Sequence, residues 1–252
     1  MISACCIVKN EEENILRWLH CARQIADEII VVDTGSTDRT KEILEEEGIF
    51  YFIAPWLGDF SAAKNTAISR ASKKWIVFLD ADEYFADEDI PKVKELIYRA
   101  EDISEIAGIS CPCINLDGEK ILSEGMQTRI FRNKSYIQYH GRVHETLMPN
   151  GQWLRVAPVN DIKIWHTGYS ANVIRKKCKR NLEILLDDIA RRGEKWTDAF
   201  YLTDCYYGLD QYEEAMLWAK KALDCGKVLE GFEGRIKNII MSCTIKRALS
   251  YQ

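Results

Sequence analysis

Apolar residues in the first half of the chain fall into short continuous runs that alternate with amphipathic segments. Continuous runs bounded by turn residues are typical of buried strands, whereas apolar residues three and four positions apart are typical of helices. The pattern therefore predicts alternating strands and helices up to residue 113. The predicted strands are 2–8, 28–32, 50–53, 75–79 and 106–113, and the predicted helices are 14–26, a segment ending near 48, 60–71 and 90–100.

This alternation predicts an α/β domain with a parallel sheet, helices on both faces and right-handed crossovers. Ligands of such sheets bind beyond the carboxyl ends of the strands. Polar clusters follow three of the predicted strands, at 9–12, 33–38 and 80–83. Because these strand ends share one edge of the sheet, we expect the three clusters to converge in space and to form a site.

The pattern changes after residue 115. Short β-like pieces at 126–131, 136–139 and 159–165 are followed, beyond residue 168, by continuous helical periodicity. The predicted helices are 181–192, 197–208 and 212–225, and the last two resemble one tetratricopeptide-type helix pair. One such pair cannot bury its own apolar face, so we expect it to pack on other helices, on the first domain or on a protein partner, a second copy included. We place the domain boundaries at 1–172 and 173–252.

Composition narrows the classes of function. The 252 residues are 47% hydrophobic and 29% charged, which is typical of a globular protein. The net charge of −5 does not favour a nucleic-acid partner. Residues 1–172 carry a net charge of −8 and residues 173–252 a net charge of +3. An acidic domain that binds a phosphorylated ligand would need a cation as intermediary.

The nine cysteines include no C-x-x-C pair. We interpret them as reduced and mostly buried small hydrophobic residues, without a zinc site. No signal peptide and no apolar run of about 18 residues is apparent, so we expect no transmembrane segment and a cytoplasmic location.

Asp80 and Asp82 form the most informative polar pair, because they directly follow the buried run 75–79. Two carboxylates at the end of a strand suit a hard divalent cation, Mg²⁺ or Mn²⁺, which usually shares such ligands with the phosphates of a substrate. The alternative is a pair of turn carboxylates that cap the chain without a ligand.

Four ordered segments of the first domain resemble family 2 glycosyltransferases of the GT-A fold. Three downstream segments resemble a subgroup in which tetratricopeptide-like helices follow the transferase domain, as in lipopolysaccharide-core glucosyltransferase-like proteins and sublancin-type S-glycosyltransferases. The first four are IVKNEE (7–12), IVVDTGSTD (30–38), DFSAAKN (59–65) and FLDADE (78–83), and the other three are TRIFR (128–132), GRVHE (141–145) and HTGY (166–169).

The resemblance implies an inverting transfer of a sugar from a nucleotide-diphosphate donor, a UDP-sugar above all, to a peptide, lipid-linked or saccharide acceptor. It implies that Asp82 binds the cation in catalysis and that Asp80 lies by the ribose or a metal-bound water. A late histidine is a further metal ligand in some GT-A enzymes, and His166 follows a predicted strand. A histidine satisfied within the core is the alternative for His166.

The resemblance also implies a nucleotide-binding side. Asp33 would face the base or ribose, and the alternative is a turn carboxylate that precedes a helix. Asn10 and Glu11 end the first strand on the same side. Asp59 and Lys64 belong to a segment that contacts the base or diphosphate in relatives, although Lys64 could equally be a solvated helix residue.

An inverting transfer needs a general base on the acceptor side. Many family 2 enzymes use an Asp that follows a Glu at a helix start, and no such pair stands between 115 and 150. We therefore assign the base to Glu145, in the His-Glu motif. The alternative is a carboxylate that pairs with Arg142 or Arg129.

Three further interpretations compete. The basic run 175–180 is typical of a solvated helix face, and its rival is a contact with diphosphate or with anionic lipid at the inner face of a membrane. A nucleotidyltransferase is disfavoured because residues 9–12 lack glycine. A tetratricopeptide-like adaptor with a degenerate transferase domain is the main alternative function, and the intact acidic residues argue against it.

Overall fold

The computed structural model describes residues 1–168, 171–227, 229 and 232–249. Its contacts divide the chain into two compact units, Met1–Ser170 and Ala171–Gln252. Compactness does not assign a function to either unit, so the functional domains 1–172 and 173–252 stay a prediction. Tyr169, which belongs to the last resembling segment, lies outside the described residues.

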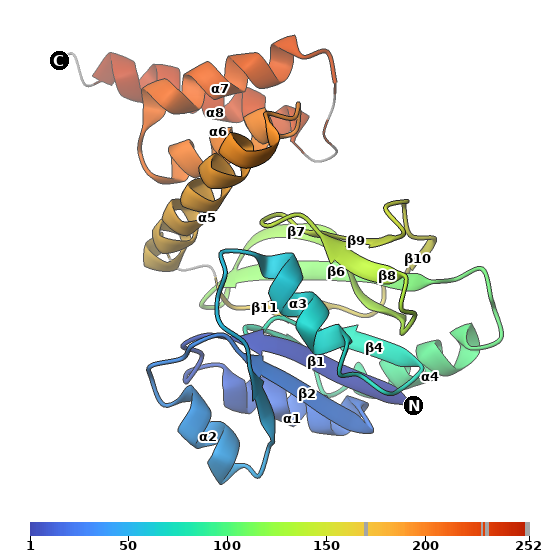
Figure 1. Ribbon diagram of the computed structural model, residues 1–252. Coiled ribbons are helices and arrows are strands. Elements are labelled where there is room, and N and C mark those ends of the chain that lie inside the picture. Colours follow the sequence, from blue (N-terminus) through green and yellow to red (C-terminus); the bar gives the residue numbers. More distant parts are fainter. Residues whose placement is uncertain (169–170, 228, 230–231, 250–252) are drawn as a thin grey trace. The chain divides into compact units, whose positions relative to one another are not determined.

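The first unit is built on a nine-stranded sheet (Figure 1). Its strand order is β3-β2-β1-β4-β7-β6-β11-β5, and β10 pairs with β6 outside this path. The strands are β1 (Ile2–Val8), β2 (Glu28–Asp33), β3 (Tyr51–Ile53), β4 (Trp75–Phe78), β5 (Glu83–Phe85), β6 (Gly108–Asp117), β7 (Lys120–Arg132), β10 (Val156–Pro158) and β11 (Ile164–His166).

The four strands β3, β2, β1 and β4 run parallel, which confirms the predicted α/β class with a mostly parallel sheet. Strand β7 is antiparallel to both of its neighbours, β4 and β6. A hairpin joins β6 to β7, with Asp117 paired to Lys120 and Gly118 at a φ of 59°. Glycine at the first central position of a two-residue loop suits a hairpin turn. The sequence pattern did not predict this antiparallel insertion.

Helices cover both faces of the sheet, as predicted (Figure 1). Helices α1 (Ile15–Ile25), α2 (Thr40–Glu46) and α4 (Ile90–Ala100) contribute to one core cluster, and α3 (Phe60–Ile68) contributes to the other. The second cluster also includes residues of a small separate sheet made of β8 (Ile137–His140) and β9 (Thr146–Pro149). Both faces of the large sheet are therefore buried, which explains its continuous apolar strands.

Most predicted elements occur close to their predicted bounds, and the largest disagreement is at 159–165. The predicted strand there is wrong, because two short strands, β10 and β11, flank a segment that contains Asn160 and Asp161. Polar turn residues at these two positions interrupt the apolar run. The short strands β5 and β9 were not predicted.

The second unit consists of α5 (Ala171–Arg192), α6 (Asp198–Gly208), α7 (Tyr212–Asp224) and α8 (Glu233–Leu249). Helices α6 and α7 correspond to the predicted pair, and α8 was not predicted. The small residues Ala215, Ala219 and Ala222 on α7 are fully buried, which allows the neighbouring helices to approach closely.

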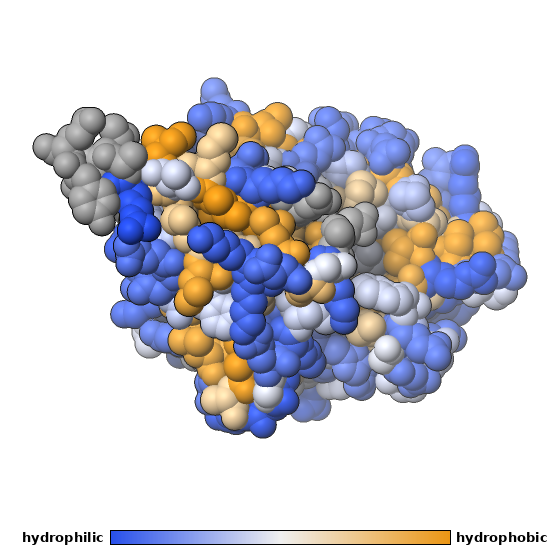
Figure 2. All heavy atoms as spheres, turned by 90° about the horizontal axis from the view of Figure 1, so that it is seen from above, coloured by the Kyte–Doolittle hydropathy of each residue, from blue (hydrophilic) through white to orange (hydrophobic). Residues whose placement is uncertain are grey.

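The surface of the second unit is mixed. Exposed apolar side chains include Leu217, Met241 and Ile245, and apolar residues are interspersed with hydrophilic ones on the face in Figure 2. Arg175 of the basic run is exposed and forms an ion pair with Asp210 at 2.6 Å. Among the described residues, no helix is long and apolar enough to cross a membrane.

Candidate functional site

The loops that follow β1 and β2 are joined by hydrogen bonds. The backbone N–H of Asn10 donates to Oγ of Ser36 at 3.0 Å, and the N–H of Thr37 donates to Oδ1 of Asn10 at 2.8 Å. The N–H of Glu11 donates to Oγ1 of Thr40 at 2.8 Å. Two of the three predicted polar clusters therefore meet at the carboxyl edge of the sheet.

The carboxylates of Asp33 and Asp59 both accept backbone hydrogen bonds. Asp33 is 1% exposed and accepts from the N–H groups of Gly35 at 2.9 Å and Ser36 at 3.0 Å. Asp59 caps the start of α3 by accepting from the N–H of Ala62 at 2.8 Å. These contacts fix the local turns, and the predicted contacts of both residues with a nucleotide stay predictions.

Lys64 is a buried residue that bridges two of the predicted site carboxylates. Its side chain is 2% exposed, and its Nζ lies 2.9 Å from Oδ1 of Asp80 and 2.8 Å from Oε1 of Glu145. The rings of Phe78 and Tyr139 each lie 5.2 Å from the same nitrogen. The alternative of a solvated lysine is therefore wrong.

The charges around Lys64 determine its protonation. Burial lowers the pKa of Lys64, but the negative charges of Asp80 and Glu145 outweigh burial and raise the pKa above its ordinary value. Lys64 therefore carries the ammonium form at neutral pH. Glu145 thus has an ion-pair partner that the sequence did not predict.

Arg129 forms a second cationic contact to Asp80. Its Nη2 lies 2.8 Å from Oδ2 of Asp80 and 2.6 Å from Oε1 of Glu83, which is 1% exposed. Burial raises the pKa of Asp80, but the charges of Lys64 and Arg129 lower it to a net value well below the ordinary range. Asp80 therefore remains a carboxylate that the protein itself neutralises.

Asp82 and His166 form the third part of the site. Nε2 of His166 lies 3.0 Å from Oδ2 of Asp82, and both side chains are 13% exposed. Nδ1 of His166 lies 2.8 Å from Oδ1 of Asn115. The amide of Asn115 is oriented by its own bond, since its Nδ2 donates to Oγ of Ser123 at 2.9 Å.

This chain of bonds constrains the imidazole. Because Oδ1 of Asn115 can only accept, Nδ1 of His166 carries the hydrogen in the assigned network. In a neutral ring, the lone pair of Nε2 would then face the carboxylate of Asp82 at 3.0 Å. Either a proton on Nε2, which makes an imidazolium–carboxylate pair, or a metal cation satisfies this arrangement. The pair is therefore compatible with a cation site whose histidine is already oriented.

Several acidic side chains meet in this site. They are those of Asp80, Asp82, Glu83 and Glu145, and Lys64, Arg129 and the imidazole of His166 lie against them. Burial raises the pKa of Glu83 above its ordinary value. Carboxylates and an imidazole in one cluster are ligands that suit a divalent cation.

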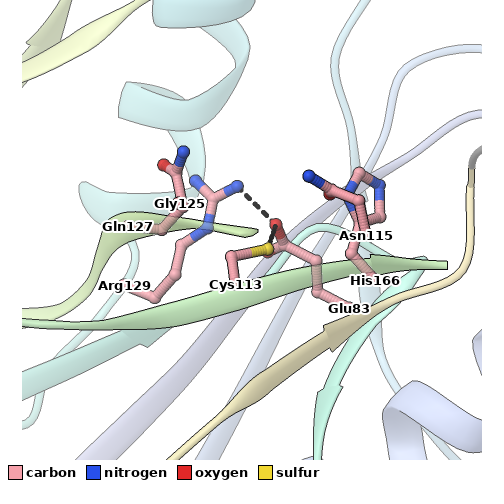
Figure 3. Close-up of a pocket in the computed structure, with 7 residues that line it drawn as sticks. All are labelled: Glu83, Cys113, Asn115, Gly125, Gln127, Arg129 and His166. Carbon is pink, nitrogen blue, oxygen red and sulfur yellow. Dashed lines mark hydrogen bonds and ion pairs between the residues drawn. The ribbon is translucent and has the colours of Figure 1, made fainter. Parts of the chain in front are cut away.

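A cavity of about 180 Å³ opens beside the histidine (Figure 3). Glu83, Cys113 and His166 place one potential ligand atom each within 4.8 Å of one another, which makes a second ligand set that shares His166. Burial and the charge of Glu83 raise the pKa of Cys113 to about 12, so this group is a thiol. The cavity wall is formed by Glu83, Cys113, Asn115, Gly125, Gln127, Arg129 and His166.

Several site residues escaped prediction from the sequence. Glu83 and Arg129 lie inside segments that resemble the family, so the resemblance could have identified them as site residues. Asn115 and Gln127 carried no local signal, because only the β6–β7 pairing brings them to the cavity. Cys113 was interpreted as a small hydrophobic residue, and it is buried but lines the site.

Comparison with known proteins gives a family match and similar chains. Residues 3–148 match the family described as "Glycosyl transferase family 2". The SPbeta prophage-derived glycosyltransferase SunS of Bacillus subtilis is 29% identical over 243 residues, which cover 95% of this chain and 57% of SunS. A TPR repeat-containing protein of Synechococcus elongatus is 34% identical over 150 residues, which cover 57% of this chain and 34% of that protein.

The fold also has a similar solved structure. Residues 1–349 of TarS from S. aureus, in complex with UDP-GlcNAc, superpose with a TM-score of 0.50 and 13% identity, covering 96% of this chain and 84% of that one. This likeness supports the GT-A type of fold. The chain spans little more than half of the length of SunS.

Proposed function

Since the chain belongs to glycosyl transferase family 2, we propose that it is an inverting, metal-dependent glycosyltransferase that uses a UDP-sugar donor. The observation that carries the proposal is the Asp82–His166 pair, which Asn115 orients and which lies close to the carboxylate of Asp80 in the sequence and beside the cavity.

The residues fit a divalent cation. A carboxylate oxygen of Asp82 and an imidazole nitrogen of His166 are ligands that Mn²⁺ accepts, and Mg²⁺ would use Asp82 with waters and phosphates. Oδ1 of Asn115 accepts from Nδ1 of His166 and so holds the imidazole in one tautomer, as is typical of metal-ligating histidines. When bound, the cation would neutralise the charge that develops on the leaving nucleoside diphosphate.

The nucleotide side of the site comprises Asn10, Glu11, Asp33 and Asp59. The first three belong to the joined loops after β1 and β2. The solved TarS structure of similar fold contains UDP-GlcNAc, and this supports UDP-sugars as the first donors to test. In our proposal Lys64 serves the donor side through Asp80, because its buried ammonium positions that carboxylate.

Glu145 is our proposed general base. Its side chain is 15% exposed, and Lys64 holds it in place at 2.8 Å, on the same nitrogen that binds Asp80. A carboxylate in this position would accept the proton of the attacking hydroxyl or thiol while the sugar leaves the diphosphate. Peptide, lipid-linked and saccharide acceptors all remain compatible with this chemistry.

The helical unit is our proposed contact region for an acceptor, a protein partner or a second copy. An adaptor protein with an inactive transferase domain would use the same helices, and it would bind no donor. The cytoplasmic location, with or without contact of the basic run 175–180 to a membrane face, belongs to the same proposal.

A donor screen tests the proposal. Full-length protein is incubated with UDP-, GDP- and TDP-sugars with and without Mn²⁺, and sugar hydrolysis and the melting temperature are measured. We expect a Mn²⁺-dependent response to at least one donor, which Asp82→Ala removes. Asp87→Ala is the control, because Asp87 is a nearby exposed carboxylate that contacts His20 at 3.2 Å.

Two results would contradict the proposal. A wild-type protein without any response to the donors would favour the adaptor. A Mn²⁺-dependent response that is unchanged in Asp82→Ala would show that Asp82 does not bind the metal.

A further inference from the structure

We propose that the cavity between β6, β7 and β11 binds the ring of the transferred sugar, and that Gly125 sets the size of sugar it accepts. This inference rests on the proposed function and names the part of the site that would select the sugar. Four observations carry it: the shared histidine, the polar side chains that line the cavity, its volume and the absent side chain of residue 125.

The covalent structure of the donor determines where its sugar must lie. In a nucleotide-diphosphate sugar, one oxygen joins the anomeric carbon to the second phosphate, so the ring lies next to any cation that binds the diphosphate. His166 contacts Asp82 through Nε2 and also lines the cavity. The cavity is therefore the space that directly adjoins the proposed cation site.

The cavity offers polar side chains to a ligand. The amide of Gln127 projects from β7 on the same side as Arg129 (Figure 3). Arg129 lines the same cavity, and its Nε is enclosed by protein. The hydroxyl groups of a sugar would form hydrogen bonds with the exposed polar atoms of these side chains.

The volume suits a small polar ring. A space of about 180 Å³ corresponds to roughly six water molecules at the volume of bulk water. Its walls combine amides, a carboxylate and a guanidinium, which include both donors and acceptors of hydrogen bonds. Such a lining matches a ring that carries several hydroxyl groups.

Gly125 keeps this space open. Residues 125, 127 and 129 alternate onto one face of β7, and Glu124 projects from the other face. A Cβ atom added at Gly125 would have no atom within 4 Å, and the φ of this residue lies in the range that other residues adopt. A larger side chain is thus compatible with the backbone and would occupy the cavity. Gly108, in contrast, would place a Cβ 2.7 Å from Leu154.

The test compares binding of UDP, UDP-glucose and UDP-N-acetylglucosamine to full-length protein by calorimetry in the presence of Mn²⁺. For Gly125→Val we expect at least about tenfold weaker binding of the UDP-sugars that wild type binds, with UDP affinity unchanged. Gln127→Leu should weaken the binding of the same UDP-sugars by about three- to tenfold, which corresponds to the loss of one or two hydrogen bonds. Glu124→Val, with the same new side chain on the opposite face, should behave as wild type.

Unchanged UDP affinity in each variant also serves as the check on folding. The inference is overturned if Gly125→Val binds the UDP-sugars as wild type does, or if it loses UDP and UDP-sugars equally. Both results would leave the proposed function standing. Wild-type protein that binds none of the three nucleotides would overturn the proposed UDP-sugar function, and the inference with it.

Discussion

The ammonium nitrogen of Lys64 lies 2.8 Å from Oε1 of Glu145, and the same atom lies 2.9 Å from Oδ1 of Asp80. One buried cation thereby holds a carboxylate that follows β4 and a carboxylate of the loop before β9. The two sides of the proposed reaction, donor and acceptor, are coupled through this nitrogen.

Replacement of Lys64 should strongly destabilise the protein. In Lys64→Met, Glu145 would lose its partner at 2.8 Å and Asp80 would keep Arg129 alone, and breaking a buried ion pair costs about 3–5 kcal/mol. The free energy of unfolding from urea denaturation measures the loss. Lys94→Met, at an exposed position of α4, is the control and should change stability by less than about 0.5 kcal/mol. Equal stability of the two variants would show that the bridge contributes little.

Replacement of Glu145 should separate donor binding from sugar transfer. The amide of Glu145→Gln still accepts a hydrogen bond from Lys64 but cannot serve as a general base. We expect an unchanged dissociation constant for the donor and a turnover lower by about 10²- to 10⁴-fold. Calorimetry and a nucleotide-release assay with an acceptor that supports wild-type turnover measure the two quantities. Full turnover of this variant would place the base elsewhere.

Replacement of Asn115 should weaken the binding of the cation without removing a ligand. Asn115→Leu would remove the acceptor that lies 2.8 Å from Nδ1 of His166. Loss of a hydrogen bond that orients a metal-binding histidine typically lowers metal affinity by about 10- to 100-fold. Titration of Mn²⁺ in the presence of UDP measures the affinity. Ser123→Ala removes only the bond that orients Asn115, so its effect should be smaller. Wild-type affinity in Asn115→Leu would contradict the cation role of His166.

Glu28 should contribute stability that depends on pH. Burial raises the pKa of Glu28, but hydrogen bonds from Ser3 and Ser72 lower it to a net value below the ordinary range. A lowered pKa in the folded state stabilises the protein above the unfolded-state pKa of about 4.3, and the gain is lost as the pH falls through the folded-state value. Glu28→Gln should therefore be less stable than wild type by about 1–2 kcal/mol at neutral pH.

Urea denaturation of both proteins across the acidic range tests this prediction. The two free energies of unfolding should converge as the pH falls below the folded-state pKa of Glu28, because wild type then also carries a neutral group at this position. A difference that stays constant with pH would mean that the effect comes from packing rather than from the charge.

Local sequence patterns were sufficient to predict a helix or strand whose formation depends on the periodicity of its own residues. The amphipathic helix predicted at 90–100 occurs as α4 over these residues, and the predicted helix pair occurs as α6 and α7. Burial of both sheet faces makes each central strand a continuous apolar run, so the parallel strands could be predicted directly from the sequence. The same reasoning failed for β7, because an antiparallel strand between parallel ones depends on partners rather than on periodicity.

The sequence by itself determined most of the strands and helices, the family resemblance and the acidic residues that follow the strands, because these depend on neighbours close along the chain. Only the tertiary structure decided which charges meet. Arg129 reaches Asp80 across 49 positions and His166 reaches Asp82 across 84, and both contacts require the observed strand order. Partner choice at such separations depends on how strands are ordered in the sheet, and hydrophobic periodicity carries no information about that order.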